Sequence, residues 1–99
     1  MPFRIEYSPD TEQHLRELSA RERTIVFDAV DAQLAFQPLV ETRNRKPMRP
    51  NPLAPWELRV GRLRIYYDVV QDPESVVYIR AIGVKLGNRI RIGRDLIEL

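Results

Sequence analysis

The stretch that decides the fold of this chain is residues 56–69, WELRVGRLRIYYDV. Apolar and polar residues alternate on both sides of Gly61, which is the pattern of two strands joined by a two-residue turn. Glycine at the first turn position favours a type II′ turn, whose twist matches that of the flanking strands. A turn of this length fixes the register, so we expect Arg59 opposite Arg64 and Glu57 opposite Tyr66.

The two faces of this hairpin differ in character. The face expected to lie in the core carries Leu58, Val60, Leu63, Ile65, Tyr67 and Val69. The other face carries Glu57, Arg59, Arg64, Tyr66 and Asp68. Like charges directly opposite one another destabilise a sheet by roughly 0.2–1 kcal/mol. The pair of Arg59 and Arg64 is therefore a local defect of the kind expected where a surface binds an anion.

A third strand extends both faces if Val70 pairs with Val76 across the next turn. The core face then gains Val77, Ile79 and Ala81, and the polar face gains Tyr78, Arg80 and Ile82.

The remaining pattern predicts an α+β domain. In chain order it gives a strand at 3–7, helices at 9–18 and 20–36, an irregular stretch at 37–55, the meander strands and a last short strand at 88–92. Pro9 suits the first position of a helix, and Ser19 with Glu22 forms a capping-box pattern at the start of the next. We expect two N-terminal helices packed on an antiparallel sheet of about four strands, in the order β-α-α-β-β-β, over one domain of residues 1–99.

The composition limits the chemistry. The chain has 99 residues and no cysteine, which excludes disulfides, thiol catalysis and cysteine-ligated metals and fits a cytoplasmic protein. Its acidic residues are scattered, so we expect no metal and no cofactor. His14, the only histidine, is expected on the surface of the first helix. No apolar run reaches the roughly 18 residues of a membrane span, so no membrane partner is expected.

The charge is unevenly distributed. The net charge is +2, but residues 1–36 carry four arginines and seven acids, whereas residues 37–99 carry twelve basic residues and seven acids. Only Lys46 and Lys85 among the sixteen basic residues are lysines. Because the planar guanidinium of arginine suits phosphate, this bias favours a nucleic acid or an acidic protein as partner. A basic surface that is simply solvated is the alternative.

Residues 37–55, the Pro-rich segment, contain five prolines. Proline lowers the entropy lost when a loop becomes ordered, so we expect a fixed loop with a function. Its basic residues, expected to contact RNA phosphates, are Arg43, Arg45, Lys46 and Arg49.

The polar face carries candidates for the cleavage of RNA without a metal. Such cleavage needs a base, cations that stabilise the crowded phosphate, and an acid for the leaving oxygen. Arg59 and Arg64 suit the phosphate, Glu57 is a candidate base, and Tyr66 or Lys85 is a candidate acid. Further RNA contacts are expected from Arg80, Arg89 and Arg91. Alternatively, these residues only cover a sheet face with mutual salt bridges, such as that of Arg80 with Asp68.

The chain resembles the RelE/ParE superfamily of bacterial toxins over nearly its whole length. The segments that carry the resemblance are 36–38, 45–49, 56–61, 64–67 and 81–85. By this resemblance, RelE-like members cleave messenger RNA in the ribosomal A site and ParE-like members poison DNA gyrase. The resemblance also implies an antitoxin encoded by an adjacent gene. This partner is expected to cover the polar face and residues 86–99, whose deletion should leave the helices and the hairpin folded.

Three residues match basic positions of the RelE-like pattern, namely Arg59, Arg64 and Lys85. Glu57 stands where that pattern often has a lysine, and no Tyr or His follows Lys85. We expect a type II toxin that inhibits translation as a metal-independent endoribonuclease, with the ribosome and mRNA as partners. A ParE-like gyrase inhibitor and a catalytically silent binding protein of the same fold are the alternatives.

Overall fold

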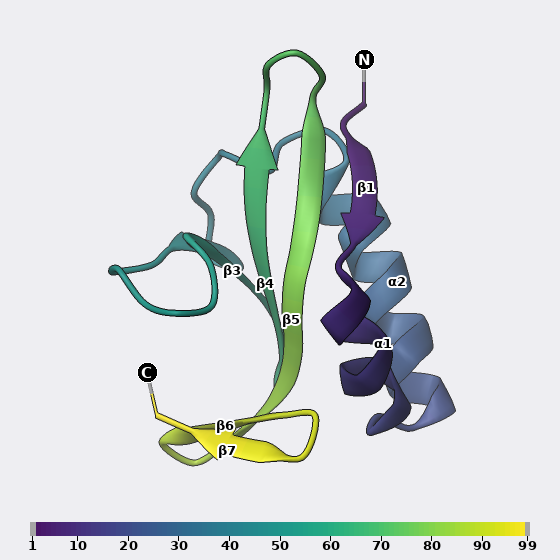
Figure 1. The fold of residues 1–99 in the computed structure, drawn as a ribbon, viewed down its shortest axis with the longest axis vertical. Coiled ribbons are helices and arrows are strands. Elements are labelled where there is room, and N and C mark those ends of the chain that lie inside the picture. The colour runs from purple at the N-terminus through teal and green to yellow at the C-terminus, as the bar shows by residue number, and fades with distance from the viewer. Residues whose placement is uncertain (1, 99) are drawn as a thin grey trace.

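A seven-stranded sheet forms the centre of the protein, in a computed structural model that describes residues 2–98. The elements are β1 (Arg4–Tyr7), α1 (Pro9–Arg16), α2 (Ala20–Leu34), β2 (Arg45–Pro47), β3 (Trp56–Val60), β4 (Leu63–Val70), β5 (Val76–Leu86), β6 (Arg89–Ile92) and β7 (Asp95–Ile97). Both helices lie on one side of the sheet, and the loop that follows β2 lies on the other (Figure 1). Neither helix within the described range is long and apolar enough to cross a membrane.

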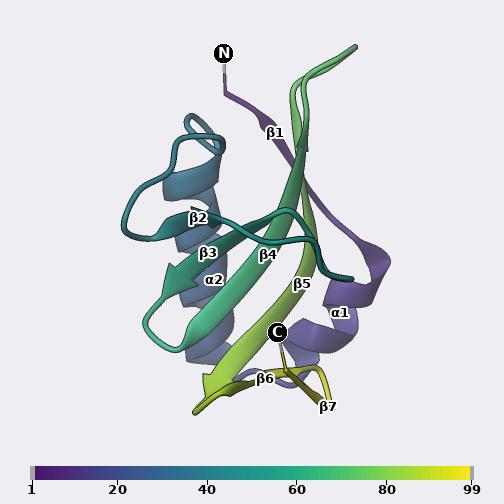
Figure 2. The ribbon, with the colours of Figure 1, turned by 90° about the vertical axis from the view of Figure 1, so that its left-hand side faces the viewer.

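The sheet confirms the α+β class but has more strands than the expected four. Its order is β2-β3-β4-β5-β6-β7, and β1 pairs with β5 in parallel. Strand β1 pairs with Val76–Ile79 and β6 with Gly83–Leu86, so both lie along the same edge of the long strand β5. Figure 2 shows the central strands with α2 behind them and the β6–β7 hairpin at the end of β5.

The hairpin of β3 and β4 has the predicted register. Arg59 lies opposite Arg64 and Glu57 opposite Tyr66. Gly61 has a φ of 58°, which is the positive value that a type II′ turn requires at its first central residue. No non-glycine residue in the described range has a positive φ, so Arg62 at the second position excludes a type I′ turn. The two-residue turn therefore fixes which side chains share a face.

The predicted faces of the third strand hold only for its first half. Val70 pairs with Val76 and Tyr67 with Ile79, but Tyr66 pairs with Ala81, so Arg80 is an extra residue in the ladder. This bulge reverses the alternation beyond it, because side chains switch faces with every residue. Ala81 was expected in the core and Ile82 on the polar face, and both assignments are wrong.

The helices cover the apolar face of the sheet. Both hydrogen bonds of the capping box between Ser19 and Glu22 are present, and α2 ends at Leu34, two residues earlier than expected. Val26, Val30 and Leu34 are fully buried against the hairpin. The inner cluster that they complete includes Leu18, Leu58, Leu63, Ile65, Tyr67, Val77, Ile79, Ile82 and Val84.

The opposite face of the sheet is covered as well. The outer cluster consists of Ala54, Tyr66, Ala81, Ile90 and Ile92, with Met48, Leu53 and Ile97 packed against it. Strand β6 belongs to this cluster, so deleting residues 86–99 would uncover Tyr66 and Ala81. The tail is therefore more than a separate basic segment, because its apolar residues alternate with its arginines and pack on the sheet. That the helices and the hairpin stay folded without residues 86–99 remains a prediction.

Candidate anion-binding pocket

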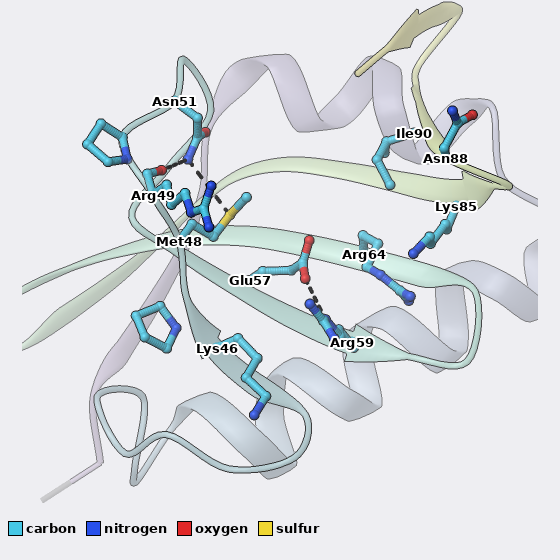
Figure 3. A pocket seen from close by; sticks show the side chains of 12 residues that line it. Lys46, Met48, Arg49, Asn51, Glu57, Arg59, Arg64, Lys85, Asn88 and Ile90 are labelled. Atoms are coloured by element: carbon cyan, nitrogen blue, oxygen red, sulfur yellow. Dashed lines mark hydrogen bonds and ion pairs between the residues drawn. The ribbon is translucent and has the colours of Figure 1, made fainter. Parts of the chain in front are cut away.

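A pocket of about 610 Å³ opens on the outer face, where the loop after β2, the β3–β4 hairpin and the start of β6 meet (Figure 3). Its lining residues are Lys46, Pro47, Met48, Arg49, Pro50, Asn51, Glu57, Arg59, Arg64, Lys85, Asn88 and Ile90. Five of these side chains are cationic and one is a carboxylate. The surplus of positive charge around one concave space attracts anions.

The two arginines of the hairpin are each held by part of the guanidinium. Arg59 Nε donates to Glu57 Oε1 at 2.6 Å. Arg64 Nη1 donates to the backbone oxygens of Gly61, at 2.7 Å, and Leu63, at 2.9 Å. The contacts of the described chain leave both terminal nitrogens of Arg59 and the Nε and Nη2 of Arg64 to a ligand. Such a pair of planar donors suits the oxygens of a phosphate.

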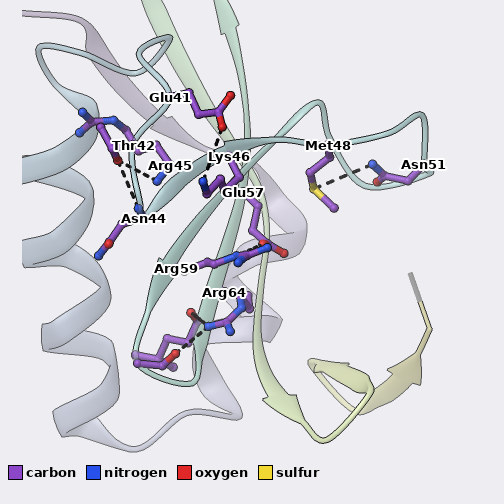
Figure 4. A network of polar contacts seen from close by, with 12 residues as sticks. Glu41, Thr42, Asn44, Arg45, Lys46, Met48, Asn51, Glu57, Arg59 and Arg64 are labelled. Atoms are coloured by element: carbon purple, nitrogen blue, oxygen red, sulfur yellow. Dashed lines mark hydrogen bonds and ion pairs between the residues drawn. The ribbon is translucent and has the colours of Figure 1, made fainter.

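Glu57 is the carboxylate of this pocket. Its side chain is 10% exposed, while that of Arg59 is 50% exposed. The register places Glu57 between Lys46 on β2 and Tyr66 on β4. Figure 4 shows its carboxylate beside the Arg59 guanidinium, with Lys46 and Arg64 nearby. Glu57 thus lines the pocket and has a cationic partner.

Tyr66 lies beneath the pocket and does not line it. The residue is fully buried in the outer cluster, and its hydroxyl has no hydrogen-bond partner in the described part of the chain. Burial, and then the negative charge of Glu57, raise the pKa of the Tyr66 phenol. This placement does not fit the role of general acid expected for Tyr66, because a buried phenol that holds its proton tightly cannot reach a leaving group.

Asn51 organises the loop that forms one wall of the pocket, and sequence reasoning missed it. Its Nδ2 donates to the backbone oxygens of Arg49 at 2.7 Å and Ala54 at 3.0 Å. Its Oδ1 accepts from the backbone N–H groups of Leu53 at 2.8 Å and Ala54 at 3.2 Å. The signal was present, since an asparagine next to a proline is typical of a turn closed by its own side chain. These bonds fit the ordered loop that the prolines predict.

The structure gathers half of the predicted site residues and disperses the others. The pocket contains Lys46, Arg49, Glu57, Arg59, Arg64 and Lys85, whereas Arg43, Arg45, Tyr66, Arg80, Arg89 and Arg91 lie outside its lining. Lys46 also forms an ion pair with Glu41, at 3.5 Å. The residues that meet are thus two of the Pro-rich segment, three of the β3–β4 hairpin and one of β5.

Arg45 is a buried residue that holds protein segments together. Its Nε donates to the Val40 oxygen at 2.9 Å, and its Nη1 donates to the Gln33 backbone oxygen at 3.0 Å. The backbone oxygen of Gln33 is one of those left free at the end of α2, so Arg45 caps that helix. This placement does not fit the RNA contact expected for Arg45.

Three arginines of β5 and the tail bind protein groups. Arg80 lies 3.6 Å from Asp68, which is the alternative salt bridge that the sequence suggested. Arg89 pairs with Glu98 at 3.5 Å, and Arg91 lies at 3.5 Å from the backbone oxygen of Glu17. A role of these arginines at the pocket would need a ligand that extends beyond it.

His14 is half-buried, although a surface position was expected. Its Nδ1 accepts the backbone N–H of Ile82 at 3.2 Å, next to the bulge of β5. The pKa of His14 is lowered overall, because the effect of burial outweighs the nearby charges of Asp10 and Asp95, which raise it. The histidine therefore joins α1 to β5 in its neutral form. No group of three His, Cys, Asp or Glu residues that could hold a metal ion is found within residues 2–98.

Comparison with known proteins gives a structural likeness. No family model and no curated protein matches the sequence. Among solved structures, a chain of the toxin–antitoxin complex RelBE2 from Mycobacterium tuberculosis superposes with a TM-score of 0.72 at 22% sequence identity. The match covers 86% of this chain and 100% of that chain. The chain therefore has a RelE-like fold, as the resemblance of its sequence implied.

Proposed function

We propose that the protein is the toxin of a type II toxin–antitoxin module and inhibits translation by ribosome-dependent cleavage of messenger RNA. The observation that carries the proposal is the convergence of five cationic side chains on one pocket, with Arg59 and Arg64 at facing positions of the hairpin that lines it. The likeness to a chain of a toxin–antitoxin complex supports the toxin role.

The pocket would act on RNA mainly through its cations. Arg59, Arg64 and Lys85 bind the phosphate at which the chain is cut, and they stabilise the charge that develops there in the transition state. Lys46 and Arg49 hold a neighbouring phosphate at the mouth. Lys85 is the candidate acid that remains at the pocket, since Tyr66 is buried below it.

An antitoxin encoded by an adjacent gene is the proposed partner. The uncovered pocket would bind RNA continually, so a host needs a protein that blocks it. A partner with acidic side chains would associate fast with this surface because opposite charges steer the encounter. The similar RelBE2 chain was solved as part of a toxin–antitoxin complex, which supports such a partner.

Induction of the protein in bacteria, followed by labelling of new protein and new DNA, tests the proposal. We expect incorporation of labelled methionine to stop while incorporation of labelled thymidine continues. The double variant Arg59→Ala, Arg64→Ala should restore growth. A matched control removes two arginines outside the pocket, Arg43→Ala and Arg80→Ala, and should remain toxic.

Inhibition of DNA gyrase is the second candidate function. It is favoured by the lack of His and Tyr among the residues that line the pocket, since these side chains are common general acids and bases. If thymidine incorporation stops first after induction, the gyrase alternative replaces mRNA cleavage.

A further inference from the structure

The contact between Glu57 and Arg59 distinguishes this pocket from a simple cluster of cations. The two residues lie on the same face of β3, and Arg59 Nε donates to Glu57 Oε1 at 2.6 Å. The carboxylate is nearly buried, whereas half of the Arg59 side chain is exposed. The nearly buried carboxylate therefore determines where the exposed guanidinium points.

Arg59 needs such a partner for two reasons. It lies directly opposite Arg64, and like charges at facing positions repel each other. It also has a long side chain that loses conformational entropy when it is held in one place. The bond to Glu57 compensates for the repulsion and engages Nε, so both terminal nitrogens are left toward the pocket that Arg64 shares.

The same geometry is unfavourable for a general base. A base must accept a proton from the substrate with an accessible oxygen. One oxygen of Glu57 is already bound to Arg59, and only 10% of its side chain is exposed.

We propose that Glu57 is a positioning residue, which orients the Arg59 guanidinium toward the ligand phosphate and takes no proton from the RNA. This role rests on the proposed function, in that the pocket binds RNA phosphates. Phosphate binding then depends on a pre-oriented pair of arginines, and the single carboxylate among the lining residues serves to orient one of them.

A matched pair of variants tests the proposal. Glu57→Gln and Glu57→Ala remove the same negative charge, but only glutamine retains an oxygen that accepts from Arg59 Nε. The probe is a single-stranded RNA oligonucleotide with 2′-O-methyl groups, which cannot be cut, and its affinity is measured by fluorescence anisotropy. We expect Glu57→Ala to bind about fivefold more weakly than Glu57→Gln, the effect of one hydrogen bond. In an Arg59→Ala background the two variants should bind equally.

Two results would overturn the positioning role. One is equal affinity of the glutamine and alanine variants while Arg59 is present. The other is a glutamine variant that binds RNA normally but no longer cleaves mRNA on ribosomes, since this would make Glu57 the base. If Glu57→Ala fails to fold, Glu57→Leu provides an apolar replacement of similar size without an acceptor.

A measurement without RNA separates this proposal from the proposed function. The Nε–Hε resonance of Arg59 in a ¹H–¹⁵N spectrum reports the bond to residue 57. We expect slow hydrogen exchange in the wild type and in Glu57→Gln, and fast exchange in Glu57→Ala and Glu57→Leu. Absence of RNA binding by the wild type would refute the proposed function alone, whereas equally fast exchange in all four proteins would refute the positioning role.

Discussion

Replacement of Gly83 by alanine is expected to displace the β6–β7 hairpin. Gly83 pairs with Ile92, and β6 approaches it closely. A Cβ atom on residue 83 would lie 2.6 Å from the backbone oxygen of Arg91. It would also lie 2.8 Å from Cγ2 of Ile90 and 2.9 Å from Cγ1 of Ile92. Because one of these contacts is with backbone, a change of side-chain rotamer cannot relieve the clash.

The size of the effect follows from the residues that must move. Overpacking at a tight site costs typically about 1–3 kcal/mol. A shift of β6 also loosens the cover that Ile90 and Ile92 provide for Tyr66 in the outer cluster. We therefore expect the free energy of unfolding of Gly83→Ala to fall by about 2 kcal/mol, which lowers the Tm by about 8–16 °C for a domain of this size.

Urea unfolding followed by tryptophan fluorescence measures this change, since Trp56 stacks on Tyr67 in the inner cluster. The control is Gly87→Asn, at a glycine with a φ of 65° where an added Cβ meets nothing within 4 Å. Asparagine tolerates this conformation better than most residues, so the control should lose little stability. A Gly83→Ala protein within about 0.5 kcal/mol of the wild type, the range of an ordinary surface change, would refute the close packing of β6 on β5.

Three further predictions concern the interior and the loop. Tyr66→Phe should leave toxicity intact. It should also retain or raise the free energy of unfolding in a urea titration, because it removes a buried hydroxyl that has no partner in the described part of the chain. Loss of toxicity at unchanged stability would restore Tyr66 as a candidate acid. Asn51→Ala should lower the free energy of unfolding by about 1–2 kcal/mol. It should also speed up amide exchange at Leu53 and Ala54, whose N–H groups donate to Asn51. Unchanged exchange would show that the loop keeps its conformation without the asparagine side chain. Burial lowers the pKa of His14 below 6.5 in the folded chain, so the unfolded chain binds more protons just below that pH. The stability that neutral His14 contributes is present above pH 6.5 and is lost as the pH falls through the folded pKa. His14→Gln should therefore flatten the decrease in unfolding free energy between pH 7 and pH 5, and an equally steep decrease in the variant would contradict this.

The sequence predicted those features that local geometry determines. The two-residue turn at Gly61 fixed the pairing of Arg59 with Arg64, and the capping box fixed the start of α2. The bulge at Arg80 could not be predicted, because apolar residues on both sides of it fit either register. Strands β2 and β7 have three residues each, too few to show an alternation.

The limits for the site have a similar cause. Lys46, Arg49 and Arg45 stand in one basic segment, and only the long-range contact of Arg45 with the end of α2 separates it from the other two. Tyr66 and Arg64 share the polar face of β4. The sequence cannot show that β6 and the loop bury Tyr66 and leave Arg64 open to the pocket. Contacts between distant segments decide both cases.

The salt dependence of RNA binding tests the central claim most directly. Each phosphate contact with single-stranded RNA contributes about −0.7 to the slope of log K against log salt concentration. Because Arg59 and Arg64 share one phosphate, we predict that Arg59→Ala, Arg64→Ala reduces the magnitude of this slope by about 0.7, whereas Arg43→Ala, Arg80→Ala, which removes two arginines outside the pocket, leaves it unchanged. An unchanged slope in the pocket variant, or an equal reduction in the control, would contradict the assignment of the pocket as the RNA-binding site.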